Sequence, residues 1–220
     1  MSKTKIFILS ILFFVAYQGN AQFDLGIRFQ TGLQNQQQAE SIYLLGPNKS
    51  VDYKLEFQSI SNTQSVGVYS QFNFGWLYFQ PEVLYTRFDK QFLVEDFKSE
   101  VSGMQVYTEE YQQFDIPINA GLRFNNFRIG GGPVFQFIQE LNTELSELRN
   151  IEISPKNITA GFQGGIGFDY KVLHFDVKYQ RNFASVSDHL FFASTPTKLK
   201  NTSSQIQFGV ALALGNKERK

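Results

Sequence analysis

One stretch of the chain contains the residue types of a hydrolase triad. Ser185, Ser187, Asp188 and His189 lie within five positions of one another. In such a triad a histidine takes the proton of a serine, and a carboxylate orients the histidine. Adjacency in sequence does not create that geometry, and nothing nearby supplies an oxyanion hole. We therefore predict that the chain is not an enzyme, with a lipid-modifying activity through Ser187 and His189 as the weaker alternative.

A second candidate pair is Asp169 and His174, which flank a tight turn at residues 171–172. Facing residues of a hairpin lie on the same side of the sheet, so we expect the imidazole to hydrogen-bond the carboxylate. Neither histidine has a metal-ligand partner at useful spacing. The glycines at 130–132 lack the Lys-Ser/Thr that follows a phosphate-binding loop. We expect no metal and no cofactor.

The elements that would position these residues are strands. After residue 21, Phe, Tyr, Val and Ile recur at every second position, with Gly, Gln, Asn or charged residues between them. This period of two predicts strands. The segments with this pattern are 24–33, 63–72, 77–87, 110–124, 127–138, 157–170, 173–183 and 203–214. Most are near or above the roughly nine to eleven residues with which a tilted strand crosses a bilayer.

The connections between these eight segments alternate in length, at about 29, 4, 22, 2, 18, 2 and 19 residues. Outer-membrane barrels join short periplasmic turns to long external loops, whereas a soluble sandwich has no reason to do so. We predict an all-β fold, an eight-stranded antiparallel up-and-down transmembrane β-barrel. The predicted external loops are 34–62, 88–109, 139–156 and 184–202. A lipocalin-like soluble barrel is the alternative, because alternation alone does not say which face is inside.

The first 21 residues have the three parts of a signal peptide: Lys3 and Lys5, the apolar segment 6–17, and Gly19-Asn20-Ala21. Twelve apolar residues are too short to span a hydrocarbon core of about 30 Å. We predict a cleaved signal peptide at 1–21 and a barrel domain at 22–220. The chain has no cysteine, which excludes disulfides, thiolate metal sites and lipoprotein attachment. Its 20 basic and 20 acidic residues indicate no nucleic-acid partner.

If the apolar face meets lipid, the polar face is enclosed. An eight-stranded barrel is just wide enough for side chains to fill, so its balanced charges predict a hydrogen-bonded network rather than a conducting pore. Arg123 and Arg128 face each other across a turn, where two like charges repel. We therefore expect a carboxylate, Asp169 or Asp176, to lie between or opposite them. The predicted interior polar network comprises Arg28, Glu82, Asp115, Arg123, Arg128, Asp169, His174, Asp176 and Lys178.

Arg87 and Arg181 share the outward phase but lie toward the external ends of their strands. Arginine is suited to bidentate contact with phosphate, so both could contact lipopolysaccharide. The alternative is that their side chains simply extend to the headgroup layer. The sequence leaves both interpretations open.

Several phrases resemble the PorT-like outer-membrane β-barrel family over essentially the whole mature chain, after a leader ending Asn20-Ala21-Gln22. These are Gln80-Pro81-Glu82-Val83-Leu84-Tyr85, Phe114-Asp115-Ile116-Pro117-Ile118, Gly131-Gly132-Pro133 and Gly165-Ile166-Gly167-Phe168-Asp169-Tyr170. The resemblance implies an eight-stranded outer-membrane barrel without catalytic residues, and one family member belongs to a protein-secretion system. Because Pro81, Pro117 and Pro133 each remove a ladder hydrogen bond, we expect bulges or strand ends there.

Taken together, these patterns predict an outer-membrane barrel of the Gram-negative envelope with a structural or binding role through its external loops. Its expected partners are outer-membrane lipid, lipopolysaccharide and other envelope proteins. The alternative function is an accessory subunit of an outer-membrane secretion or transport complex.

Overall fold

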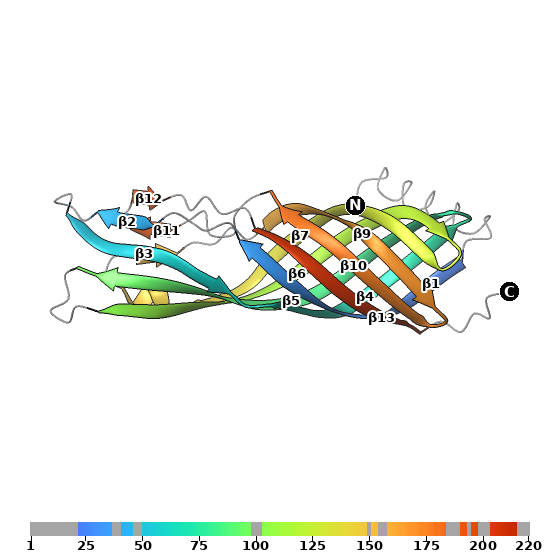
Figure 1. Cartoon of the computed structure of the whole chain (residues 1–220), viewed down its shortest axis with the longest axis horizontal. Helices are drawn as coiled ribbons and strands as arrows, with labels where there is room; N and C mark the ends of the chain where they lie inside the picture. The colour runs from blue at the N-terminus through green and yellow to red at the C-terminus, as the bar shows by residue number, and fades with distance from the viewer. Residues whose placement is uncertain are drawn as a thin grey trace, which may run out of the picture.

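The computed structural model describes residues 22–36, 41–45, 50–97, 103–148, 151–153, 158–183, 190–192, 195–197 and 203–214. Its eight long strands are β1 (Gln22–Gln36), β4 (Thr63–Phe74), β5 (Leu77–Asp96), β6 (Met104–Phe124), β7 (Phe127–Thr143), β9 (Ile158–Tyr170), β10 (Leu173–Asn182) and β13 (Ser203–Ala213). They pair antiparallel in the order β5-β4-β1-β13-β10-β9-β7-β6, and β6 pairs with β5 to close the ring (Figure 1). The predicted eight-stranded up-and-down barrel is therefore confirmed.

Two-residue turns join neighbouring strands at one end of the barrel, which we call the turn end. The first turn residue has a positive φ in each case: 63° at Gly75, 52° at Asn125 and 56° at Lys171. This left-handed backbone matches the twist of the paired strands and permits the shortest hairpin connection. The predicted four-residue connection at 73–76 was wrong in length, because β4 and β5 stay paired as far as Phe74 and Leu77.

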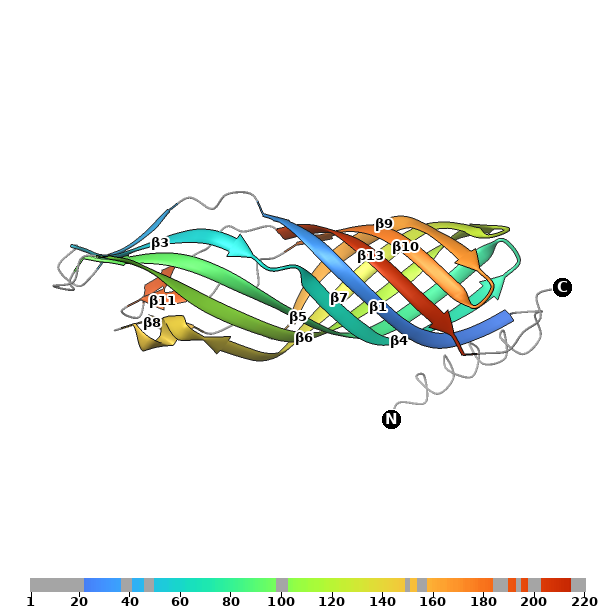
Figure 2. The ribbon, with the colours of Figure 1, turned by 60° about the horizontal axis from the view of Figure 1, so that its bottom comes forward.

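At the other end, the extended end, the chain forms ordered structure beyond the barrel. β3 (Val51–Ile60) pairs with β5, and β2 (Ile42–Leu45) pairs with β3. The 3-10 helix η1 (Glu144–Glu147) follows β7, and β8 (Ile151–Ile153), β11 (Leu190–Phe192) and β12 (Thr195–Thr197) form a small second sheet. Figures 1 and 2 show this extension projecting from the barrel along its length.

Strand β5 connects the barrel to the extension by changing its partner. It pairs with β4 up to Arg87 and with β3 from Lys90 onward. Much of the predicted loops 34–62, 88–109 and 139–156 is therefore strand or helix, which corrects the loop prediction. The reason is that the extension has an apolar core of its own, which the alternation within the barrel strands does not indicate. This core consists of Leu44, Tyr53, Leu55, Phe92, Val94 and Leu145, flanked by Phe57, Tyr107 and Leu148.

The barrel is apolar outside and polar inside. Outward side chains such as Phe29 and Ile166 are 59% and 62% exposed, whereas inward Arg28 and Asp169 are fully buried. An apolar band on every strand far exceeds the few hundred Å² that a soluble monomer exposes in one patch. It matches the lipid-facing wall of a transmembrane barrel, with aromatic Trp76, Phe124, Phe127 and Tyr170 exposed at the turn end. The soluble-barrel alternative is excluded on this ground.

The expected bulges or strand ends at the prolines were wrong. Pro81 lies opposite Ile118, and the β5–β6 pairing resumes at Leu84 and Asp115 in the same register. The β6–β7 pairing likewise resumes in register after Pro117. Each proline interrupts a few pairings without shifting the strand, since the ring fixes each strand from both sides. The β6–β7 register does shift between Gln112 and Gln113, where Gln139 is an extra residue on β7, and this shift lies where the barrel passes into the extension.

The predicted leader, residues 1–21, lies outside the described residues. Within the ranges that the structure describes, no helix is long and apolar enough to cross a bilayer.

We expect Gly75→Ala to destabilise the protein by about 1 kcal/mol relative to Gly103→Ala. A Cβ at either glycine would meet no atom within 4 Å, but only Gly75 has a positive φ. A left-handed backbone raises the free energy of an L-residue in the folded protein by about 1–2 kcal/mol. The second effect of a Gly→Ala change, the loss of backbone freedom in the unfolded chain, is the same in both variants. Urea unfolding in lipid vesicles, followed by the fluorescence of the single tryptophan, measures the difference; equal stabilities would contradict the role of this turn.

Candidate functional site

The centre of the barrel lumen holds a cluster of charged side chains from strands that are far apart in sequence. The Arg28 guanidinium on β1 donates to Asp176 Oδ2 on β10 at 2.7 Å and lies 3.2 Å from Glu82 Oε2 on β5. Lys178 Nζ donates to Glu82 Oε1 at 2.9 Å. All four side chains are buried. Each of these four charges therefore has an opposite charge in contact with it.

Arg128 on β7 continues this cluster toward the turn end. Its Nε donates to Asp169 Oδ1 at 2.9 Å, and its Nη2 donates to Asp176 Oδ1 at 3.1 Å. Its Nη1 donates to Gln80 Oε1 at 2.8 Å. The two oxygens of Asp176 thus join Arg28 to Arg128, and the ion pairs form one continuous network, which we call the lumen network.

Asp169 lies among three partners near the turn end. Arg123 and Arg128 are direct cross-strand neighbours, and Asp169 contacts both guanidinium groups, at 3.5 and 2.9 Å. His174 Nδ1 hydrogen-bonds Asp169 Oδ1 at 2.7 Å. The structure therefore brings Asp169 and His174 together, as the hairpin geometry predicted. Asp169, one of the two carboxylates that the sequence left open, contacts both arginines.

Asp115 is the member of the predicted set that stands apart. It is buried in the same lumen but nearer the extended end. Its carboxylate accepts hydrogen bonds from Thr86 at 2.7 Å, Gln113 at 2.7 Å and Gln136 at 3.2 Å, all of them neutral donors. Sequence phase placed Asp115 on the correct face but could not tell which side chains surround it.

Two aromatic members of the lumen were missed by sequence reasoning. Tyr69 is 1% exposed; its ring centre lies 5.6 Å from Arg28 Cζ and 5.6 Å from the His174 ring. Tyr78 lies 5.8 Å from Arg128 Cζ. Both occupy the inward phase of their strands, which is the signal that could have found them. Cation–π attraction between each ring and its arginine stabilises the buried positive charge.

Glycines make room for these large charged side chains. A Cβ on Gly167 would lie 2.6 Å from Asp176 Oδ1 and 3.0 Å from Arg128 Nη2, and one on Gly209 would lie 3.1 Å from Arg28 Nη1. The cavity beside Arg128 has a volume of only about 10 Å³, roughly the space of one water molecule. At this level the barrel cross-section is filled by its own side chains.

The two remaining candidates that the structure describes, Arg87 and Arg181, are not brought together. Arg87 and Arg181 are both on the outer wall, but β4, β1 and β13 separate their strands. Ser187 and His189 lie outside the described residues. Among the residues that the structure describes, no group of three or more acidic, histidine or cysteine side chains could hold a metal ion.

A second buried cluster lies just beyond the apolar band of the barrel. The outward-facing pair Arg87 and Glu110 marks the end of that band. The rings of Phe88 and Tyr111 stack with centres 4.9 Å apart, and Lys90 Nζ lies 4.3 Å from the Tyr111 centre. Burial lowers the pKa of Lys90 to about 8, an effect that the nearby Glu109 carboxylate opposes.

Comparison with known proteins finds no match in sequence and distant likenesses in structure. No family model and no curated protein sequence matches the chain. The structure is similar to that of Neisserial surface protein A, at 12% identity over 88% of this chain and 98% of that one, with a TM-score of 0.41. It is also similar to the outer membrane protease OmpT from Escherichia coli, at 10% identity, 88% and 96% coverage and a TM-score of 0.39. Likenesses this distant carry no argument about activity, and the PorT-like resemblance stays a prediction.

We expect Asp176→Asn to destabilise the barrel by about 3–5 kcal/mol, because it removes the carboxylate that joins Arg28 to Arg128 and leaves buried positive charge uncompensated. Asp115→Asn is the matched control, since its hydrogen-bond donors are neutral and its loss should be about 1 kcal/mol. Urea unfolding in vesicles compares the two variants. Equal losses would show that the ion pairs do not set the stability of the lumen.

We expect the Lys90 amine to titrate near pH 8. Carbon-13 NMR of labelled lysines in detergent micelles should show one such signal, which Lys90→Met removes. Lys54 is the control, because its hydrogen bond to Glu56, at 2.6 Å, raises its pKa above 10.5. Between pH 8 and about 10.5 the unfolded chain binds more protons than the folded one, so the extension should become more stable as pH rises. Titration of every lysine above pH 10 would contradict this.

Proposed function

We propose that the chain is an outer-membrane barrel with a non-catalytic structural or binding role, and that the extension is its binding surface outside the cell. The observation that carries this proposal is the packed apolar core of the extension. A barrel that served only as an anchor would not need strands that continue beyond the bilayer and are folded around a core of their own.

The filled lumen supports a binding role over conduction. Arg28 and Arg128 both contact Asp176 within the barrel interior. A conducting channel needs a continuous water-filled path, as in much wider barrels. Side chains that neutralise one another across the lumen leave little room for such a path.

The outward face of the extension has the composition of an interaction surface. Tyr43, Met104 and Val106 are 55%, 57% and 49% exposed. They share this face with Lys54 and Glu95, through the cross-strand pairings of β2, β3, β5 and β6. Tyrosine and methionine are enriched at the centres of protein interfaces, with charged groups at the rim. We propose another envelope protein as the partner of this face.

The direction of insertion follows from the two ends of the barrel. Outer-membrane barrels keep short turns in the periplasm and direct their long connections outward. The tight turns at Gly75, Asn125 and Lys171 are all at the turn end, opposite the extension. We therefore propose that the extension lies outside the cell.

A second candidate function is an accessory subunit of a secretion or transport complex. It is favoured by the edge strand β2, which within the described residues pairs on one side only, with β3. A partner strand could extend the sheet there. Stable co-purification with larger outer-membrane proteins would distinguish this function from a free-standing surface receptor.

Cysteine labelling of intact cells tests the proposed orientation. The chain has no cysteine, so Met104→Cys and Trp76→Cys each introduce a single thiol, at the extended and turn ends. We expect a membrane-impermeant maleimide to label Met104→Cys on intact cells and Trp76→Cys only after the outer membrane is opened. The reverse pattern would overturn the orientation.

Photo-crosslinking tests the binding surface. We expect a photoreactive amino acid at Tyr43 to form a discrete protein adduct on intact cells, and the same group at Trp76 not to form it. Tyr43→Glu, which places a charge on the same face, should abolish the adduct formed from position 104. The proposal fails if the extension forms no adduct specific to it.

A further inference from the structure

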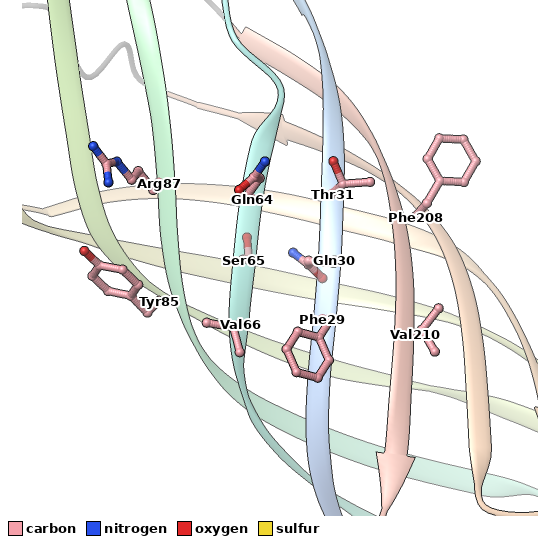
Figure 3. Close-up of a pocket in the computed structure, with 10 residues that line it drawn as sticks. All are labelled: Phe29, Gln30, Thr31, Gln64, Ser65, Val66, Tyr85, Arg87, Phe208 and Val210. Carbon is pink, nitrogen blue, oxygen red and sulfur yellow. The ribbon is translucent and has the colours of Figure 1, made fainter.

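A groove of about 580 Å³ crosses the outer wall of the barrel over β13, β1, β4 and β5 (Figure 3). It lies within the apolar band, so in a bilayer the molecules that reach it are lipids. Its volume is within the range of about 300–1,000 Å³ of pockets that hold a small molecule. A groove on this wall is therefore a candidate lipid site.

The groove is formed by two cross-strand rows of different polarity. The row nearer the turn end is Val210, Phe29, Val66 and Tyr85, which pair in that order across the four strands. The row nearer the extended end is Phe208, Thr31, Gln64 and Arg87. The hollow arises because the slim Val66 and Thr31 lie between the rings of Phe29, Tyr85 and Phe208 (Figure 3). An apolar floor below a polar edge matches an acyl chain below its head group.

Arg87 lines the polar edge of the groove, and two carboxylates, Asp89 and Glu110, lie beside it without lining the groove. Arg87 is exposed and uses Nη2 to contact Glu110 Oε2 at 3.3 Å, so its other N–H groups can donate to a phosphate. Asp89 and Glu110 lie directly opposite each other on neighbouring strands. Like charges in this position repel, and the single guanidinium of Arg87, which contacts Glu110, offsets only one of the two. One guanidinium beside two carboxylates suits a head group with both a phosphate and an ammonium.

We propose that this groove, which we call the wall groove, binds one molecule of phosphatidylethanolamine, with an acyl chain over Val66, the phosphate at Arg87 and the ammonium at Asp89 and Glu110. The multiply anionic head group of lipopolysaccharide is disfavoured, because both carboxylates would face it. The inference rests on the proposed placement of the barrel in the outer membrane. Arg181 takes no part, since it lies on β10 and three strands separate it from Arg87.

Native mass spectrometry of the full chain in detergent tests this, with phosphatidylethanolamine, phosphatidylglycerol and lipid A added separately. We expect phosphatidylethanolamine to be retained in preference to both others. Val66→Phe should fill the groove and remove the bound lipid. Val68→Phe is its control, because Val68 is the next outward residue of β4, is 52% exposed and does not line the groove.

Head-group variants test the charges separately. Arg87→Gln should weaken phosphatidylethanolamine binding about tenfold or more, as loss of a hydrogen bond to a charged group predicts, whereas Arg181→Gln should leave it unchanged. The double variant Asp89→Asn, Glu110→Gln should lose the preference over phosphatidylglycerol, since only the ammonium distinguishes the zwitterion from the anion.

The possible results separate this proposal from the proposed function. Equal retention of all three lipids, preference for lipid A, or binding that survives Val66→Phe would overturn the wall groove while leaving the barrel and its orientation intact. Failure of the folded chain to insert into vesicles would instead overturn both. Correct insertion is scored independently, by protection of the barrel strands from protease.

Discussion

Pairing every cation of the lumen network with a carboxylate is the constraint on which the rest of the structure depends. Lipid on the outside requires apolar residues on one face of each strand, and the period of two then directs the polar residues into a narrow ring. Unpaired charge in that ring would oppose closure. Asp176 contacts Arg28 from β1 and Arg128 from β7, while itself lying on β10. The ion pairs of the lumen network therefore need strands from several parts of the barrel to come together, because no two neighbouring strands contain all of these partners.

The same network separates the two ends of the molecule. Below it, tight turns close the hairpins and aromatic side chains lie at the rim; above it, Asp115 is surrounded by neutral amides and hydroxyls. Beyond the rim the strand pattern changes, because β5 exchanges β4 for β3 and the sheet begins to bury an apolar face of its own. The stacked Phe88 and Tyr111 lie at this transition, with Lys90 against them. The barrel therefore continues directly into the extension through β5.

The outer wall is not uniform, because a groove crosses its apolar band. Its apolar band alone explains insertion, but the wall groove requires small side chains at Thr31 and Val66 between larger ones on adjacent strands. Charges at its edge, including the facing Asp89 and Glu110, lie where the apolar band ends. Lipid around a barrel can thus be recognised by shape and charge together, at a place where β4 and β5 are still part of the ring and the extension begins just above.

The sequence by itself determined the eight strands, the face on which each residue lies and the hairpin neighbours, because alternation and two-residue turns are local properties. It therefore predicted that Asp169 would lie with His174, and that Asp169 or Asp176 would lie between two arginines. Only the tertiary structure decided which distant charges meet, such as Arg28 and Asp176, 148 positions apart, and that Asp115 meets none of the cations. It also decided that much of the predicted loops is strand, and that Pro81 and Pro117 interrupt pairing without a bulge. These outcomes depend on strand register around a closed ring and on packing between segments distant in sequence, which no local pattern encodes.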